Sequence, residues 1–259
     1  MKPHRASAPI LPPVSPPVSP LLTRPAPKAV VSWSAHRRRV VECSRCPRLR
    51  AHCRAVAREK RKAFAAETYW GKPVPAFGDP DAALVVVGLA PAAHGANRTG
   101  RMFTGDRSGK WLYRALHKAG FANQPDSRSI HDGLKLQGAI VTAAARCAPP
   151  GNKPTPRELA NCSEYLNWEI ARLANARVYL ALGKIAFDRA YALLKARGLT
   201  LPARARPKFA HGARVELGGG RWLLASYHPS QQNTFTGKLT ERMFDSVFRE
   251  ARNLIRKAA

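Results

Sequence analysis

Residues 88–106 read GLAPAAHGANRTGRMFTGD and decide the fold that we expect of this chain. They follow the β-branched run LVVV at residues 84–87, which is typical of a fully buried strand. They precede residues 108–120, whose pattern predicts a helix that begins near Ser108 and ends before Gly120. Connections between strands and helices usually have roughly two to six residues. This longer, glycine-rich connection leaves the carboxyl end of a strand, which indicates a ligand-binding loop of an α/β protein.

The charge of the chain is its most unusual bulk property. Its 259 residues include 44 Lys and Arg against 16 Asp and Glu, a formal net charge of +28. Such a charge attracts phosphate backbones or anionic membranes, and the lack of a basic amphipathic anchor helix favours nucleic acid. No apolar stretch is long enough to predict a membrane span. No secretory signal is recognised either, so we expect a cytosolic protein. We also expect this protein to be a monomer.

The sequence divides into a tail and one domain. Residues 1–40 are rich in Pro, Ala and Ser and have no apolar period, which predicts a disordered tail. Residues 41–259 alternate strand and helix patterns without a repeat or a second core. We therefore expect a parallel sheet with helices on both faces. Further strands are predicted at 139–145 and 177–182, a hairpin at 215–226, and further helices at 48–64, 156–173, 183–198 and 240–257.

Five cysteines without a secretory signal favour a metal site over disulfides. Cys43 and Cys46 form a CxxC pair, whereas fourteen residues separate Cys147 from Cys162. Four thiolates suit either tetrahedral zinc or an iron–sulfur cluster, and the wide second pair fits a cubane cluster better. Zinc remains a serious alternative on spacing alone. Cys53 is left over, and we expect a buried or free thiol there rather than a ligand.

A second candidate site motif, His228-Pro229-Ser230, follows the last predicted core strand. It is expected at the same carboxyl edge of the sheet as residues 88–106. Pro229 restricts the backbone after the imidazole and directs the ring over the cleft. A histidine in this place can donate a hydrogen bond to an oxyanion that develops during a reaction.

Together, these features resemble the uracil-DNA glycosylase superfamily, and within it the iron–sulfur families 4 and 5. The pattern at residues 88–106 looks like family 5, also called type B, and the resemblance extends over residues 40–257. It implies a three-layer α/β/α sandwich with a four-stranded parallel sheet and hydrolytic removal of uracil from DNA without a lyase step. It also implies use of other deaminated bases. The [4Fe–4S] cluster that it implies would be held by Cys43, Cys46, Cys147 and Cys162.

The resemblance also assigns roles to single residues. Phe103 would stack on the flipped base. His228 would face the uracil O2, where negative charge grows, and Asp106 would orient water or stabilise an oxocarbenium-like sugar. The other residues that it places at the substrate are Gly88, Ala90, Pro91, Ala92, His94, Asn97, Ser230 and Asn233.

Some positions depart from the pattern of the related families. Those families carry a carboxylate or amide in the first motif, where this chain has Leu89 and Ala90. Ala143 replaces an asparagine of family 4, and Ala92 stands where a bulky residue excludes the thymine methyl. These changes indicate a roomier pocket. On residues alone, two other classes stay open: a non-catalytic, zinc-stabilised nucleic-acid-binding module, and an iron–sulfur redox enzyme, for which no dinucleotide fingerprint is present.

Overall fold

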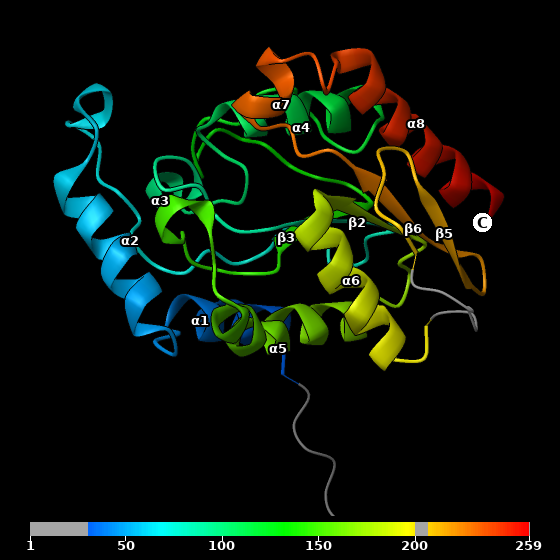
Figure 1. Cartoon of the computed structure of the whole chain (residues 1–259), viewed down its shortest axis with the longest axis horizontal. Coiled ribbons are helices and arrows are strands. Elements are labelled where there is room, and N and C mark those ends of the chain that lie inside the picture. The colour runs from blue at the N-terminus through cyan, green and yellow to red at the C-terminus, as the bar shows by residue number, and fades with distance from the viewer. Residues whose placement is uncertain (1–30, 200–206, 259) are drawn as a thin grey trace, which may run out of the picture. The chain divides into compact units, whose positions relative to one another are not determined.

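The strand expected at residues 84–87 lies in the middle of a mixed sheet (Figure 1). The computed structural model describes residues 31–199 and 207–258. Within these ranges the sheet has six strands, in the spatial order β1 (Phe77–Gly78), β3 (Ala139–Ala143), β2 (Leu84–Gly88), β4 (Val178–Leu182), β6 (Arg221–Ser226) and β5 (Arg214–Gly218).

The four inner strands are parallel, and each edge strand is antiparallel to its neighbour. The α/β class and the four-stranded parallel core are therefore confirmed, but the expected count of four strands is wrong. The edge strand β5 comes from the hairpin predicted at 215–226. The edge strand β1 has two residues, too few to show an alternating pattern, and the sequence gives no signal for it.

Both faces of the sheet are covered by helices (Figure 1). Consecutive side chains of β2 point to opposite faces, so Leu84 and Val86 enter one core and Val85 and Val87 enter the other. This explains the uninterrupted apolar run of the strand. The first core packs under α4 (Arg107–Lys118) and α8 (Glu241–Lys257), and the second under α5 (Pro156–Arg172) and α6 (Lys184–Ala196).

The remaining helical segments are short or lie near the amino-terminal side of the domain. They are α1 (Trp33–Val41), α2 (Pro47–Glu59), η1 (Lys62–Phe64), α3 (Ala96–Thr99), η2 (Pro150–Asn152) and α7 (Gln231–Phe235). Among the described residues, no helix combines the length and apolar character needed to cross a membrane.

Two helix starts show how local chemistry sets the boundaries. At α5, Thr155 and Glu158 form a capping box at the start of the helix predicted over residues 156–173. At α4, the cap is Asp106 rather than Ser108, because the carboxylate of Asp106 accepts the backbone N–H of Gly109 at 2.8 Å. The helix is therefore capped two residues earlier than the sequence pattern suggests, at the last residue of the glycine-rich stretch.

The predicted tail of residues 1–40 needs a correction at its end. Residues 1–30 lie outside the described part of the chain, but Trp33–Val41 forms α1. His36 of this helix is buried, and its ring lies 3.2 Å from the carboxylate of Glu169 in α5. The same carboxylate accepts from Arg146 and from the hydroxyl of Thr142, each at 2.6 Å. This buried network makes α1 part of the domain, which begins before residue 41.

Candidate active site

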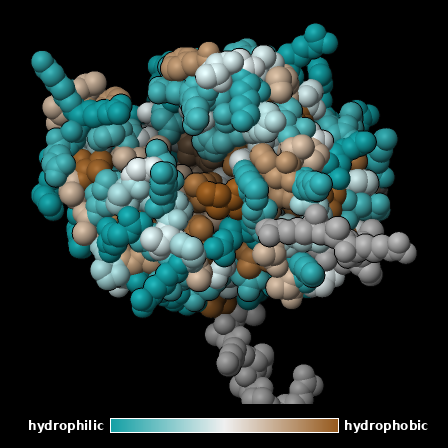
Figure 2. Space-filling view, in the orientation of Figure 1, coloured by the Kyte–Doolittle hydropathy of each residue, from teal (hydrophilic) through white to brown (hydrophobic). Residues whose placement is uncertain are grey.

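The site is set by the order of the parallel strands. The chain passes from β2 to β3 on one side and later to β4 on the other side of β2. In open α/β sheets, ligands bind at the carboxyl ends of strands where the order reverses in this way. Gly88 ends β2 there, and residues 89–106, the β2–α4 loop, continue from it. Figure 2 shows hydrophobic residues gathered in a hollow near the centre of a largely hydrophilic face.

Phe103 occupies an unusual backbone conformation at this site. Its φ angle is +54°, a left-handed value that bulky residues rarely adopt, and its side chain is buried. Two glycines make the space for it. A Cβ on Gly88 would lie 2.7 Å from the Phe103 ring, and a Cβ on Gly109 would lie 1.7 Å from the Phe103 carbonyl oxygen. The sequence places Phe103 in the loop, and these glycines fix its ring against the end of β2.

His228 lies beside Phe103, as the sequence analysis expects. The two ring centroids are 5.8 Å apart and the ring planes are inclined by 32°. His228 comes from the turn that follows β6, and its carbonyl oxygen accepts from the Nδ2 of Asn233 at 2.9 Å. Burial lowers the pKa of His228 to about 4. The imidazole is therefore neutral at physiological pH and has one N–H to donate.

Asp106 is the last residue of the β2–α4 loop, and its two carboxylate oxygens have different surroundings. Its Oδ1 caps α4, while a Cβ on Gly95 would lie 2.2 Å from its Oδ2, so the Oδ2 lies close against the backbone of Gly95. Burial raises the pKa of Asp106, although the backbone N–H groups of Gly109 and Ser108 and the charge of Arg98 oppose this. One oxygen of the carboxylate thus serves the fold.

Arg98 stabilises the β2–α4 loop by hydrogen bonds to carbonyl groups of the loop itself. Its Nε donates to the carbonyl of His94 and its Nη2 to the carbonyl of Gly105, both at 2.9 Å. Its guanidinium also pairs with Glu67 and lies 3.9 Å from the centroid of the Phe64 ring. The side chain is 8% exposed, so Arg98 ties the two ends of the loop together rather than facing DNA.

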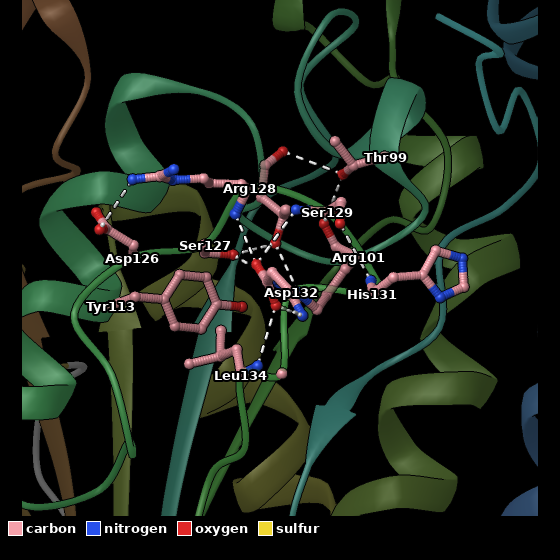
Figure 3. Close-up of polar contacts among 12 residues, drawn as sticks. Thr99, Arg101, Tyr113, Asp126, Ser127, Arg128, Ser129, His131, Asp132 and Leu134 are labelled. Atoms are coloured by element: carbon pink, nitrogen blue, oxygen red, sulfur yellow. Dashed lines mark hydrogen bonds and ion pairs between the residues drawn. The ribbon is translucent and has the colours of Figure 1, made fainter.

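A second arginine of the loop, Arg101, links it to Ser127 and Asp132 (Figure 3). Arg101 donates to both carboxylate oxygens of Asp132, to the hydroxyl of Ser127 and to that of Thr104, at 2.6–2.9 Å. Burial alone would raise the pKa of Asp132, but the bonds from Arg101 and from three backbone N–H groups hold it well below its usual range. Those N–H groups belong to Arg128, Ser129 and Leu134. No sequence pattern predicts a role for residues 127–134.

The side-chain nitrogen of Asn97 bonds within the protein, while its Oδ1 is buried without a partner among the described residues. Its side chain is fully buried, and its Nδ2 donates to the carbonyls of Cys53 and Ala93, each at 3.3 Å. The residue therefore links α3 to α2. Asn233, which the sequence also assigns to the substrate, similarly holds the His228 turn. Both amides act on the residues that shape the site.

His94 keeps a place at the edge of the site. Its Nδ1 lies 3.0 Å from the hydroxyl of Tyr69, and its side chain is partly exposed. Burial lowers the pKa of His94, and the nearby positive charges of Arg61 and Arg98 lower it further.

The other expected substrate residues contribute mainly backbone. Pro91 is buried, and the carbonyl of Ala92 accepts from the N–H groups of Gly95 and Asn97 at 3.2 and 3.1 Å. Ala90 packs against the small apolar cluster that contains Cys162. Ser230 is the residue that begins α7.

The cysteines gather at one end of the domain. All five are free thiols, and Cys46, Cys53 and Cys147 share one apolar cluster with Leu49 and Ala148. Burial raises the pKa of Cys162, and Cys46 and Cys43 raise it further, although a backbone hydrogen bond and the charge of Arg146 oppose this. A hydrogen bond with Cys53 and burial both raise the pKa of Cys147. Within the described residues, however, no three His, Cys, Asp or Glu side chains are arranged as a metal site.

An exposed aromatic residue near the site escapes the sequence analysis. Phe235 ends α7 and is 67% exposed, while the guanidinium of Arg107 lies 4.3 Å from its ring centroid. Arg107 directly follows Asp106, and α7 directly follows the His228 motif. The pair thus joins the outer ends of the two segments that carry the candidate catalytic residues. Spacing alone could not reveal it, because the contact depends on the fold.

Comparison with known proteins agrees with this geometry. A family model described as the uracil DNA glycosylase superfamily matches residues 75–252. The chain belongs to the uracil-DNA glycosylase superfamily. It is 53% identical to the type-5 uracil-DNA glycosylase of Thermus thermophilus over 212 residues, which are 82% of this chain and 93% of that protein. It is 52% identical to the type-5 uracil-DNA glycosylase of Mycobacterium tuberculosis over 213 residues, 82% of this chain and 78% of that protein.

The similarity to a type-4 member of the uracil-DNA glycosylase superfamily is weaker. The type-4 uracil-DNA glycosylase of Archaeoglobus fulgidus is 30% identical over 159 residues, 61% of this chain and 70% of that protein. The resemblance to family 5 is therefore confirmed. Ala143, one of the departures from the type-4 pattern, pairs with Gly88 at the carboxyl ends of β3 and β2. Ala143 therefore lies in the wall of the site and brings no polar side chain to it.

Proposed function

We propose that this protein is a DNA-repair glycosylase that hydrolyses the N-glycosidic bond of uracil in DNA and leaves an abasic site. The supporting relatives are named type-5 uracil-DNA glycosylases. The single observation that carries the proposal is the placement of Phe103 on the backbone of Gly88, with His228 beside it. An aromatic face next to a neutral N–H donor suits an unstacked base whose departure creates an anion.

The chemistry follows from these two rings. Phe103 stacks on the flipped base and holds it at the end of β2. As the bond between C1′ and the base nitrogen breaks, its electron pair moves into the base, and negative charge grows on the base oxygens. The neutral N–H of His228 donates to that charge. A donor of this kind contributes on the order of 10²–10³ in rate.

Water completes the hydrolysis. It attacks C1′ of the sugar and leaves a hydroxyl group there, and the proton that it loses passes to Asp106 or to solvent and finally neutralises the released base anion. Asp106 is the carboxylate of the β2–α4 loop, and burial raises its pKa toward the range useful for a base. We assign it the role of orienting this water or balancing the positive charge of the sugar, with Oδ1 kept on the α4 cap.

The same site supports use of deaminated bases besides uracil. Ala143 and Ala90 present no polar group that would select one base edge, and Ala92 leaves space for added substituents. Selection by a hydrogen-bonding pocket is strong because a wrong partner leaves buried polar groups unpaired. A pocket without such groups discriminates less.

DNA binding is supported by charge and by one exposed ring. The formal net charge of +28 favours the phosphate backbone in a salt-dependent manner. Phe235 is exposed beside the site with Arg107 against it, and an exposed aromatic ring can stack on bases that the flipped nucleotide leaves behind.

A [4Fe–4S] cluster on Cys43, Cys46, Cys147 and Cys162 is part of the proposal. The chemistry of the donor set supports it, because the four thiols come from the α1–α2 connection, the β3–α5 connection and α5, and Cys46 and Cys147 share one apolar cluster. In the part of the chain that the structure describes, no three of these side chains are arranged as a metal site. When bound, the cluster would cross-link these segments. Cys53 donates to the carbonyl of Ala148 and stays outside this set.

One assay tests the proposal. Purified protein is incubated with a duplex oligonucleotide that carries a single uracil, and abasic sites are revealed by strand cleavage in alkali. We expect abasic sites at the uracil and none in the matched thymine duplex. A protein that binds both duplexes and cleaves neither would support the alternative of a non-catalytic nucleic-acid-binding module.

A further inference from the structure

A histidine outside the predicted site contacts the turn that carries His228. His211 lies just before β5, and its Nδ1 accepts the backbone N–H of Tyr227 at 3.2 Å. Its Nε2 lies 3.3 Å from the carbonyl oxygen of Met243 in α8. An amide N–H can only donate and a carbonyl can only accept, so the ring is neutral with its proton on Nε2. One imidazole therefore links the end of the sheet to α8.

The bond from Tyr227 stands at the point where the sheet ends. Ser226 is the last residue of β6, and its carbonyl accepts the N–H of Gly183 at 2.8 Å. Tyr227 is the next residue, and its N–H turns to His211. The turn is then held again at the carbonyl of His228 by Asn233. His211 and Asn233 thus fix the backbone on the two sides of the His228 side chain.

Burial favours the same neutral state. The His211 and Tyr227 ring centroids are 5.2 Å apart. Burial lowers the pKa of His211, although its bond to the carbonyl of Met243 opposes this. The neutral ring is the form that can accept from Tyr227.

We propose that His211 is a positioning residue, which holds the Tyr227 peptide so that His228 faces the substrate beside Phe103. This inference rests on the role given to His228 in the proposed function. Without the bond from Tyr227, the first peptide of the turn loses its acceptor, and the His228 ring can move away from Phe103. A displacement of about 1 Å in a reacting group can cost up to about 10²-fold in rate.

Two variants separate this role from a general contribution to stability. In H211N, the side-chain oxygen can take the place of Nδ1 and accept from Tyr227, while the contact with Met243 is lost. In H211Q, the amide nitrogen can take the place of Nε2 and donate to Met243, while the acceptor for Tyr227 is lost. H211N removes the bond to Met243, and H211Q removes the bond from Tyr227 together with a 3.4 Å contact between Nδ1 and the Ser226 hydroxyl. Similar melting temperatures are expected, because that hydroxyl also donates to the Tyr227 carbonyl in both variants. His117, exposed on α4, offers matched controls in H117N and H117Q.

The experiment measures the single-turnover rate on uracil DNA at saturating enzyme, the affinity for abasic product DNA and the NMR signals of the His228 ring. We expect H211Q to lose at least about tenfold in rate and to shift the His228 signals. H211N should stay near the wild-type rate, and product affinity should not change. Equal rates for the two variants, or a rate loss matched by lost product affinity, would overturn the proposal. If the wild type released no uracil, the proposed function would fail, and the His228 signals would still test His211.

Discussion

The ring of Phe103 rests on the backbone of Gly88 so closely that a single added Cβ would lie 2.7 Å from it. The strand that ends in Gly88 is rigid on both sides, because its neighbours β3 and β4 pair with it along its length. The sheet therefore sets the position of Phe103, although Phe103 belongs to a long loop.

Replacement of Phe103 by alanine removes the stacking face and leaves the donor of His228 in place. Stacking of one base on an aromatic ring is worth about 1–3 kcal/mol. We expect Phe103→Ala to weaken binding of uracil DNA by about tenfold or more and to slow single-turnover cleavage less. Binding and rate are measured on the same duplex, with Phe103→Tyr as the control that keeps the ring. A variant that binds normally and fails only in chemistry would contradict this role.

The two functions of Asp106 can be separated because asparagine is as good a helix cap as aspartate. Asp106→Asn should keep the melting temperature of the protein and lose at least about tenfold in single-turnover rate, since general-base contributions run to about 10²–10⁴. Asp106→Ala should show the same rate loss and also lose about 1 kcal/mol of stability. An Asp106→Asn enzyme with the full rate would remove Asp106 from the mechanism and leave it the cap alone.

The cysteines differ in their expected importance. Cys162→Ala removes a proposed ligand, whereas Cys53→Ala removes a thiol that donates to the carbonyl of Ala148. We expect the wild type and Cys53→Ala to be brown and to hold about four irons per chain, and Cys162→Ala to lose both properties. Visible absorption and metal analysis report this without an activity assay. A colourless, zinc-loaded and active wild type would show that the metal is zinc.

The lowered pKa of His228 predicts a dependence of stability on pH. The pKa of this histidine is about 6.5 in the unfolded chain and about 4 in the folded chain. As the pH falls from 6.5 toward 4, the unfolded state therefore gains a proton that the folded state does not. The free energy of unfolding should fall by up to about 3 kcal/mol through this group. Denaturant titrations of wild type and His228→Gln check this. Equal slopes with pH would contradict it.

Much of the site could be read from the sequence because its signals are local. The β-branched strand, the long glycine-rich loop and the motif at His228 each lie within a few residues, and parallel strands bring their carboxyl ends together. The place of His228 at this edge therefore follows from pattern and topology, whereas the role of Phe103 comes from the family resemblance. The confirmed family resemblance depends on the same residues.

Other features depend on contacts between distant segments, which a pattern does not contain. Asn97 is polar and lies in the loop, so the sequence suggests a substrate contact, whereas the fold turns it toward Cys53. Arg101 of the β2–α4 loop donates to Asp132, which lies 31 residues further along the chain. The sequence pattern places the amino-terminal helix in a tail, because the burial of His36 depends on Glu169, which lies far along the chain.

The most direct test is the single-turnover rate of uracil release by His228→Ala, measured together with the affinity for abasic product DNA. A lost oxyanion donor costs about 10²–10³ in rate, and backbone donors that remain reduce this loss. We predict a rate at least about tenfold below the wild type, with product affinity nearly unchanged. A His228→Ala enzyme that releases uracil at the wild-type rate would contradict the site described above.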